Sequence, residues 1–375
     1  MMKMRSLPVT LLVLLMATIL ASSCGFRRKK YENPIDKDTQ QPDKVLFDKA
    51  IKDIEKGRYE VARLTLNTLM NTYDTSEFLA KAKLAIADSW MREGGSHALA
   101  QAEAEYKDFI LFYPTMEESA EAQEKVCDIH LRQMEKPDRD LTHALRAEDE
   151  CRNLLLQFPN SQFAPQVEQK LRNIQEVIAE AEYRVGEYYY RRGSFPSAAN
   201  RLESMVNHYP LYSNADEALW LVGDAYGKLG ARFRDQSAIA YQRIVRDYPL
   251  SEYVEPAKKI LREMEKEVPE PDPVAVARMQ FELENASKTG MMHSFWGMFR
   301  KSPDTHTAAK SGKPAMTALR PTIPVSVPSA EVVAGGGSAD VTVSTVDSSN
   351  SALDTQPDAR ANPPKPEPPK EQKKQ

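Results

Sequence analysis

Cysteine is scarce in this chain, and the spacings typical of metal and phosphate sites are absent. The 375 residues include three cysteines, Cys24, Cys127 and Cys151, and no two of them lie close in sequence. None of the six histidines pairs with another at metal-ligand spacing on one predicted helix face. The triple glycine at 335–337 has no neighbouring strand or helix with which to form a phosphate loop. We therefore expect no metal and no cofactor apart from any covalent lipid, and we do not expect an enzyme.

Aromatic residues are absent beyond residue 300. The stretch 302–375 contains no Phe, Trp or Tyr and is rich in Pro, Ser, Thr, Ala and Lys. Such a composition buries too little apolar surface to offset the entropy of ordering the chain. We predict that 302–375 is a disordered tail.

The segment 269–301 is predicted to be a linker with a short helix near 274–284. Its apolar, aromatic motif at 291–300 has basic flanks. This motif could dock on a partner protein, touch a membrane or pack back on the folded domain. We favour packing or docking on protein.

A strong charge of either sign is also missing. The formal net charge is −4 and no basic face stands out, which argues against nucleic acid as a partner. Glycine is infrequent in the middle of the chain, where Ala, Leu, Glu and Lys are abundant. This composition indicates an all-helical body.

An internal repeat is the clearest positive signal. Five helix patterns end at the same kind of stop: Tyr73-Asp74, Tyr113-Pro114, Phe158-Pro159, Tyr209-Pro210 and Tyr248-Pro249. Twelve residues before the second residue of each stop lies a small residue: Ala62, Ala102, Ala147, Ala198 and Ser237. Eight before it lie Leu66, Tyr106, Cys151, Leu202 and Tyr241, and five before it lie Leu69, Phe109, Leu154, Met205 and Ile244. Three columns in register predict a repeat architecture.

Four of the five copies carry a second pattern, in which seven residues separate a small residue from a glycine. The pairs are Ala50 and Gly57, Ala87 and Gly94, Gly186 and Gly193, and Gly223 and Gly230. A glycine adopts positive φ without strain and commonly ends a helix. Proline cannot continue a helix and restricts the residue before it. Each copy is therefore predicted to be a helical hairpin with small residues at the crossing.

These features resemble tetratricopeptide (TPR) repeats, over roughly residues 44–267. The stops end at residues 74, 114, 159, 210 and 249, so they are 40, 45, 51 and 39 residues apart, against 34 in a regular TPR. We predict an all-α, TPR-like α-solenoid of five hairpins over 44–268. The predicted copies are 44–74, 77–114, 117–159, 165–210 and 214–249, followed by a capping helix at 252–267. Copy three lacks the glycine and is predicted to turn at 136–140, and copy four has a long first helix at about 165–192.

The N-terminus resembles a bacterial lipoprotein signal. A basic start precedes an apolar run from Leu7 to Leu20, and small residues precede Cys24. The run is short for a membrane span and is typical of a secretory signal. The resemblance implies a signal peptide at 1–23, a lipid on Cys24 and, because Gly25 follows, the outer membrane facing the periplasm. An ordinary signal peptide with a chance cysteine is the alternative. Residues 24–43 then form the lipidated tether, whose basic run 26–30 would lie near lipid headgroups or in solvent.

Cys127 and Cys151 fall on apolar stripes of the third hairpin. Two buried, unpaired thiols are the favoured interpretation, because packed helices usually lie about 8–10 Å apart. A disulfide across the hairpin remains open, since small residues nearby permit a closer approach and a disulfide needs Cα atoms within about 6.8 Å.

The fourth copy carries the most specific resemblance. Tyr188-Tyr189-Tyr190-Arg191-Arg192-Gly193 leads into Asn200-Arg201-Leu202-Glu203 and then Tyr209-Pro210. These motifs occur together with the lipoprotein signal ending at Cys24, the irregular copies and the long helix. In this combination they resemble the BamD (ComL) lipoprotein family of the outer-membrane β-barrel assembly machinery. The resemblance implies a non-enzymatic scaffold. Its implied partners are the barrel-inserting subunit, held by the C-terminal copies, and unfolded outer-membrane proteins, received by the N-terminal copies.

Candidate partner-binding residues follow from the same match. Arg201 is the first candidate as an interface charge, with Tyr188, Arg191 and Arg192 near the end of the long helix. Arg232 and Arg234, in the loop of copy five, are weaker candidates. Each has the alternative of a solvated or hairpin-closing residue. In the N-terminal copies, Trp90 and Tyr106 could meet substrate, but both fall on core-like stripes and rank as core first.

A second function remains open, from a different class. TPR scaffolds of the Tol–Pal type coordinate peptidoglycan synthesis or division in the cell envelope. Such proteins usually carry a coiled coil before the repeats, and residues 25–43 contain no heptads.

Overall fold

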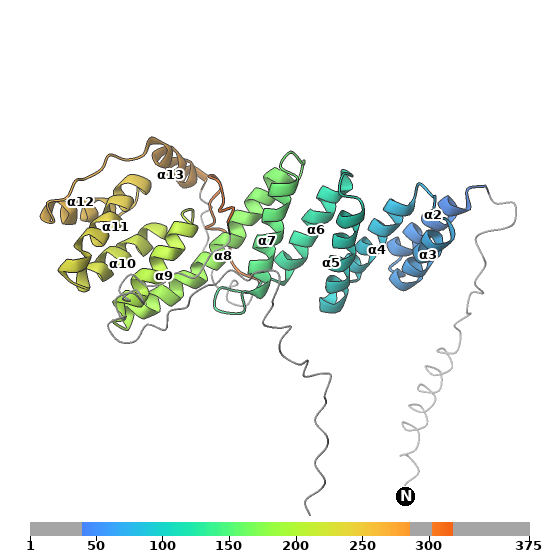
Figure 1. Ribbon diagram of the computed structural model, residues 1–375, viewed down its shortest axis with the longest axis horizontal. Helices are drawn as coiled ribbons and strands as arrows, with labels where there is room; N and C mark the ends of the chain where they lie inside the picture. The colour runs from blue at the N-terminus through green and yellow to red at the C-terminus, as the bar shows by residue number, and fades with distance from the viewer. Residues whose placement is uncertain (1–39, 286–301, 318–375) are drawn as a thin grey trace, which may run out of the picture. The chain divides into compact units, whose positions relative to one another are not determined.

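The computed structural model describes residues 40–285 and 302–317, and every regular element in these ranges is helical (Figure 1). The helices run in this order: α2 (Pro42–Glu55), α3 (Tyr59–Thr72), α4 (Leu79–Glu93), α5 (Gly95–Phe112), α6 (Glu118–Gln133), α7 (Thr142–Gln157), α8 (Ala164–Arg191), α9 (Phe195–His208), α10 (Ala215–Lys228), η1 (Ala231–Phe233), α11 (Arg234–Asp247), α12 (Val254–Glu263) and α13 (Pro273–Asn285).

From α2 to α12, each helix packs mainly on its neighbours in sequence, which is the packing of a solenoid. The hairpins pair α2 with α3, α4 with α5, α6 with α7, α8 with α9, and α10 with α11, and α12 packs on α11. Figure 1 shows these helices following one another in chain order. The predicted TPR-like α-solenoid is confirmed.

The three repeat columns form the core. Every residue at the positions twelve, eight and five before a stop is buried, including the polar Ser237. The Ser237 hydroxyl donates to the Gly223 carbonyl at 2.6 Å, which satisfies it at the crossing of α10 and α11. The column positions recur because each marks where one helix of a hairpin meets its partner.

Glycines serve two separate purposes in the hairpins. Gly57, Gly94, Gly193 and Gly230 have φ between 71° and 97°, as predicted for helix ends. Gly186 and Gly223 instead lie where two helices touch. A Cβ on Gly186 would come within 2.5 Å of the Leu202 side chain, and one on Gly223 within 2.7 Å of the Tyr241 ring. Only glycine permits these two approaches.

The third hairpin differs from the favoured expectation. A disulfide joins Cys127 of α6 to Cys151 of α7, with Cα atoms 5.1 Å apart and both side chains fully buried. The prediction of two unpaired thiols was wrong, because α6 and α7 approach more closely here than packed helices usually do. The turn before α7 agrees with expectation, since Asp140 accepts from the Thr142 backbone N–H at 3.0 Å.

The long helix α8 spans 28 residues and begins with Pro165 in its first turn. Its buried apolar residues recur at helical spacing: Val167, Leu171, Ile174, Ile178 and Tyr183. This helix packs on both α7 and α9. It therefore connects copies three and four.

The C-terminal region needs one correction. Residues 302–317, predicted as part of the disordered tail, are held against α8 by hydrogen bonds, and Ala308 is buried. Tertiary hydrogen bonds to the main chain stabilise this segment, a contribution that composition does not report. The rest of the predicted tail, the motif at 291–300, the signal peptide and Cys24 lie outside the described residues. Among the described helices, none combines the length and apolar character needed to cross a membrane.

Candidate protein-binding site

Arg201 lies on α9 and pairs with a carboxylate of α8. Its Nε is 2.6 Å from Oε2 of Glu182, and 46% of its side chain remains exposed. Burial raises the pKa of the Glu182 carboxyl, and the Arg201 charge limits that rise. The guanidinium therefore joins the two helices of copy four while still presenting a surface to solvent.

Tyr188, Arg191 and Arg192 lie together near the C-terminal end of α8. The Arg192 guanidinium is 5.7 Å from the centre of the Tyr188 ring, which is 5.9 Å from the Tyr189 ring. Arg191 pairs with Glu187 one turn earlier on the helix. Tyr188 is 55% exposed. Exposed tyrosine beside arginine is the composition typical of protein interfaces.

A hydrogen bond that the sequence did not single out connects copies four and five, and an ion pair within α10 accompanies it. Asp224 of α10 accepts from the Tyr190 hydroxyl, and Lys228 Nζ lies 2.6 Å from Asp224 Oδ2. Lys228 also lies 5.1 Å from the centre of the Phe195 ring. Burial and the Asp224 hydrogen bond raise the pKa of Tyr190. The spacing of Asp224 and Lys228, four apart on one helix, was the available signal.

The two arginines of copy five do different things. Arg232 lies in η1, with its guanidinium 5.5 Å from the centre of the Phe233 ring. Arg234 donates from Nη2 to the Met264 carbonyl at 3.0 Å, which ties the start of α11 to the end of α12. The six candidates thus lie in three places: the α8–α9 ion pair, the end of α8, and the α10–α11 turn.

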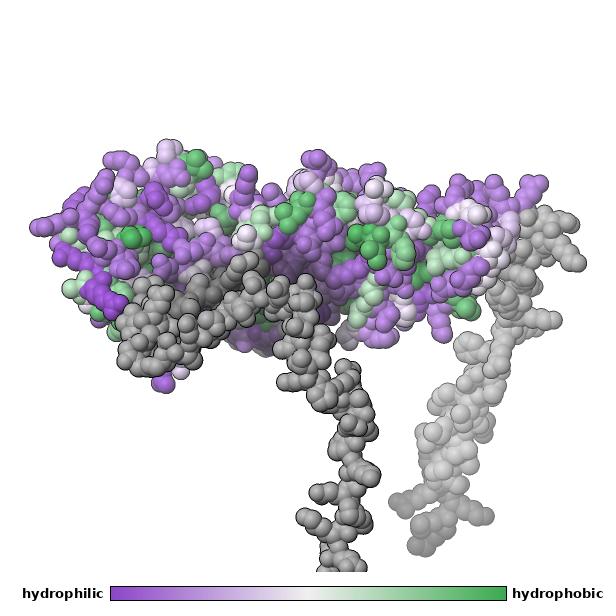
Figure 2. Space-filling view, in the orientation of Figure 1, coloured by the Kyte–Doolittle hydropathy of each residue, from purple (hydrophilic) through white to green (hydrophobic). Residues whose placement is uncertain are grey.

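The N-terminal copies contain a cavity of about 200 Å³ that is mainly apolar. Its walls come from α2, α4 and α5 and from residues 116 and 118: Phe47, Ile51, Ala80, Lys81, Leu84, Ala85, Asp88, Phe109, Met116 and Glu118. Apolar side chains also gather over α4 and α5 on the face shown in Figure 2. We call this cavity the N-terminal groove.

Trp90 and Tyr106 contribute to the core around this groove. Tyr106 is fully buried, and its hydroxyl donates to Asp88 Oδ1 at 2.5 Å. The Trp90 ring is covered by the Arg63 guanidinium, 3.4 Å from the ring centre. Both residues therefore have partners within the hairpins, in agreement with their ranking as core.

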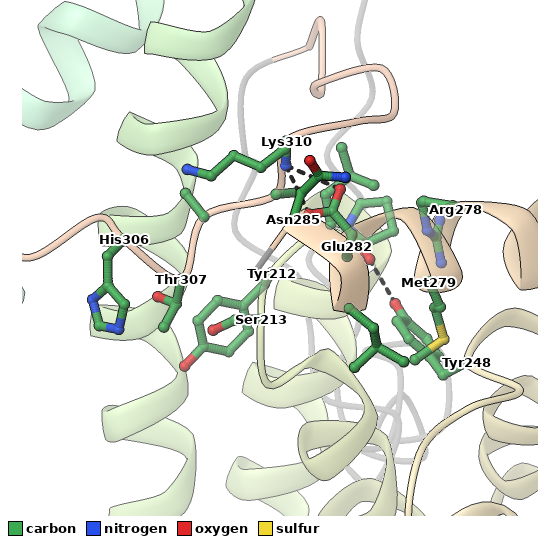
Figure 3. Close-up of a pocket in the computed structure, with 15 residues that line it drawn as sticks. Tyr212, Ser213, Tyr248, Arg278, Met279, Glu282, Asn285, His306, Thr307 and Lys310 are labelled. Carbon is green, nitrogen blue, oxygen red and sulfur yellow. Dashed lines mark hydrogen bonds between the residues drawn. The ribbon is translucent and has the colours of Figure 1, made fainter. Parts of the chain in front are cut away.

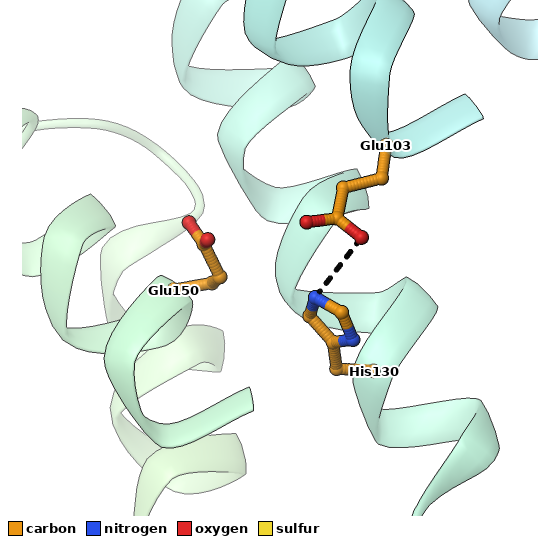
Figure 4. A group of neighbouring side chains, drawn as sticks. All are labelled: Glu103, His130 and Glu150. Atoms are coloured by element: carbon orange, nitrogen blue, oxygen red, sulfur yellow. Dashed lines mark ion pairs between the residues drawn. The ribbon is translucent and has the colours of Figure 1, made fainter. Parts of the chain in front are cut away.

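Three ligand-type side chains meet between copies two and three. Glu103 of α5, His130 of α6 and Glu150 of α7 each offer an atom within 4.8 Å of the others (Figure 4). Lys107 Nζ lies 2.7 Å from Glu103 and 2.6 Å from Glu150, so it supplies the positive charge that two carboxylates need. Burial lowers the pKa of His130, although Glu103 opposes the shift. The sequence offered no signal for this cluster, because its members lie on three different helices.

Comparison with known proteins identifies the family. Residues 39–239 match the YfiO family, which is described as outer membrane lipoprotein. The chain belongs to this family. Curated relatives of this YfiO-family chain carry the name "Outer membrane protein assembly factor BamD". The protein from Xylella fastidiosa is 26% identical over 254 residues, which is 64% of this chain and 84% of the relative. The one from Rickettsia prowazekii is 22% identical over 242 residues, 64% of this chain and 91% of the relative.

A solved structure also matches this member of the YfiO family. The crystal structure of MamA protein covers 59% of this chain and 94% of its own, at 15% sequence identity and a TM-score of 0.24. A score this low carries no argument about function.

Proposed function

We propose that this protein is a non-enzymatic scaffold that assists the assembly of β-barrel proteins in the outer membrane. The name of its relatives, outer membrane protein assembly factor, supports this function at the level of the family. We further propose that a lipid on Cys24 anchors the chain and that the solenoid faces the periplasm without a cofactor. Stacked helical hairpins suit such a task because they present long surfaces to other polypeptides.

The C-terminal copies are proposed to bind the barrel-inserting subunit of the machinery. The observation that carries this assignment is the exposed group of Tyr188, Arg191 and Arg192 at the end of α8. Arg201 adds a half-exposed guanidinium on the neighbouring helix. Tyrosine and arginine are the residues that most often dominate binding energy at protein interfaces.

The N-terminal copies are proposed to receive unfolded barrel substrates. Support comes from the 200 Å³ groove, in which Phe47, Leu84 and Met116 provide apolar walls. Lys81, Asp88 and Glu118 lie at the same groove and can meet polar groups of an unfolded chain. Unfolded barrel strands alternate apolar and polar residues, and a groove of mixed character matches that alternation.

Affinity capture of the full-length lipidated chain from mild detergent tests this function. We expect the barrel-inserting subunit among the captured proteins, and we expect depletion of the chain to lower the amount of outer-membrane barrels. Capture of Tol–Pal or peptidoglycan-synthesis proteins without the barrel-inserting subunit would instead support the envelope-scaffold alternative. That result would overturn the proposed function.

A further inference from the structure

Residues 302–317, here called the strap, lie along α8 in a fixed register. Gln169 Nε2 donates to the Ala309 carbonyl at 3.0 Å, and Arg172 donates from Nη1 to the Gly312 carbonyl at 2.7 Å. Gln175 Nε2 donates to the Ala315 carbonyl at 2.7 Å, and its Oε1 accepts from the Ala315 N–H at 3.0 Å. All three pairs differ by 140 in sequence, so the strap runs in the same direction as the helix.

Two carboxylates also hold the strap, one from α13 (Glu282, Figure 3) and one from α8 itself (Glu176). Glu282 of α13 accepts from the N–H groups of Lys310 and Ser311 at 2.9 and 2.8 Å, and from the Ser311 hydroxyl at 2.6 Å. Glu176 of α8 accepts from the Thr307 hydroxyl at 3.0 Å. Most of these hydrogen bonds are made to main-chain N–H and C=O groups of the strap, which almost every residue of any polypeptide has.

Several strap side chains that face the protein are small, and the larger Met316 also packs against the core. Ala308 and Pro314 are buried, and Ala309 and Ala315 are partly buried. Gly312 has a φ of +86°, and a Cβ there would lie 2.8 Å from the Leu211 side chain. At residues 308, 312 and 314 the site therefore admits small residues by shape, and it holds the strap through main-chain hydrogen bonds.

The strap does not fill the space between its own residues, α13 and the α9–α10 turn. A cavity of about 360 Å³ remains there, lined by apolar atoms of Leu211, Tyr248, Met279 and Leu283 among others. Figure 3 shows Met279 and Tyr248 together on one side of it, with Thr307 on the other. A longer or bulkier segment could use this additional surface.

We propose that the α8 face from Gln169 to Glu176, together with Glu282, is a peptide-binding site that the strap occupies from within the same chain. The partner that fits is a segment of another polypeptide rich in Ala, Gly, Ser and Pro, held through its main chain. A tethered segment has an effective concentration on the order of millimolar at its site. The strap therefore keeps weakly binding peptides off the α8 face, and a tightly binding peptide displaces it. The proposal does not depend on the assembly function.

The test uses the full-length chain and a labelled peptide of residues 302–317 as the probe. Ala308→Glu and Gly312→Val are two separate substitutions that dislodge the strap, the first by burying a charge and the second by strain and a clash with Leu211. Lys313→Gln, at an exposed strap position, is the matched control. Circular dichroism identifies the variants that keep the helices.

Fluorescence anisotropy is expected to show the peptide binding each folded, dislodged variant at least 10-fold more tightly than the wild type or Lys313→Gln. Adding Gln175→Leu to a dislodged variant should abolish that binding, because it removes both bonds to residue 315. Gln166→Leu, on the exposed face of the same helix, should leave it unchanged. Equal binding by wild type and dislodged chains, no binding by any of them, or binding that survives Gln175→Leu would overturn the proposal.

Discussion

Single side chains in this protein often have a role within the fold and a surface that remains open. Arg201 shows this most clearly, because it pairs with Glu182 across copy four and is still about half exposed. An effect of its loss on partner binding could therefore arise from the lost pair or from the lost surface charge. A charge exchange separates the two causes.

Arg201→Glu is expected to weaken capture of the barrel-inserting subunit while the helical circular dichroism signal is kept. In the double variant Arg201→Glu/Glu182→Arg, the internal ion pair is restored with its polarity reversed. Partner capture should stay weak in the double variant if the exposed Arg201 charge contacts the partner. Recovery of capture would show that the residue acts only through its pair with Glu182.

Two glycines of α10 offer a matched comparison at the helix crossing. Gly223→Ala forces a methyl group to within 2.7 Å of the Tyr241 ring, and we expect it to lower the free energy of unfolding by about 1–3 kcal/mol. Gly227→Ala meets only the Ser237 hydroxyl oxygen, at 3.9 Å, and should be neutral or stabilise by up to about 1 kcal/mol. Urea unfolding followed by circular dichroism measures both. Similar effects from the two substitutions would contradict the close approach.

At the scale of an element, the third hairpin is the most distinctive. It has no glycine at its turn, and its two helices are joined by the Cys127–Cys151 disulfide. The cross-link closes a loop of 24 residues between α6 and α7. Such bonds persist in oxidising compartments, and the periplasm in which we propose this chain works is one of them.

Reduction of the disulfide is expected to destabilise the solenoid by about 3 kcal/mol, because the closed loop restricts the unfolded chain. The measurement is the thermal midpoint of the wild type with and without a thiol reductant. Cys151→Ala is the control, since it has no disulfide to lose and its midpoint should not respond to reductant. An unchanged wild-type midpoint would show that the bond contributes nothing to stability.

At the scale of the whole molecule, two buried histidines are expected to lower stability as the pH falls below about 6.5. Burial lowers the pKa values of His130 and His208 from the ordinary 6.5, so the unfolded chain takes up protons at these two residues more readily than the folded chain does. The contribution of the two neutral histidines to the free energy of unfolding is fully present above pH 6.5, and it is lost as the pH falls toward their pKa values in the folded chain. In that pH range, each histidine changes the free energy of unfolding by at most about 1.4 kcal/mol per pH unit.

Urea midpoints at pH 7.5 and 5.5 measure this dependence. His130→Gln should reduce the difference between the two midpoints, because the glutamine cannot take up a proton in the unfolded chain. The groups that face His130, Glu103 and His143, remain in that variant. His97→Gln, at an exposed position of α5, is the matched control and should leave the difference as it is. A His130→Gln chain with the full wild-type dependence would show that His130 has no part in it.

The repeat could be inferred from the sequence because its determinants are local. Helix stops, small residues at crossings and apolar positions recur at fixed distances along one hairpin, and the structure buries every column that they predict. The long helix α8 and the short helix α13 were likewise visible as uninterrupted helical patterns. Helix geometry relates neighbours in sequence to neighbours in space, so these features needed no knowledge of tertiary packing.

Only the tertiary structure decided which distant residues meet. The pairing of Cys127 with Cys151 depends on how closely α6 approaches α7, and the cluster of Glu103, His130 and Glu150 depends on the stacking of three helices. The strap contacts α8 across 140 residues through main-chain groups, which carry no sequence signal at all. The sequence determined the hairpins and their order. Packing between the hairpins determined which residues of different helices come into contact, because the distances between those residues are set only once the helices are stacked.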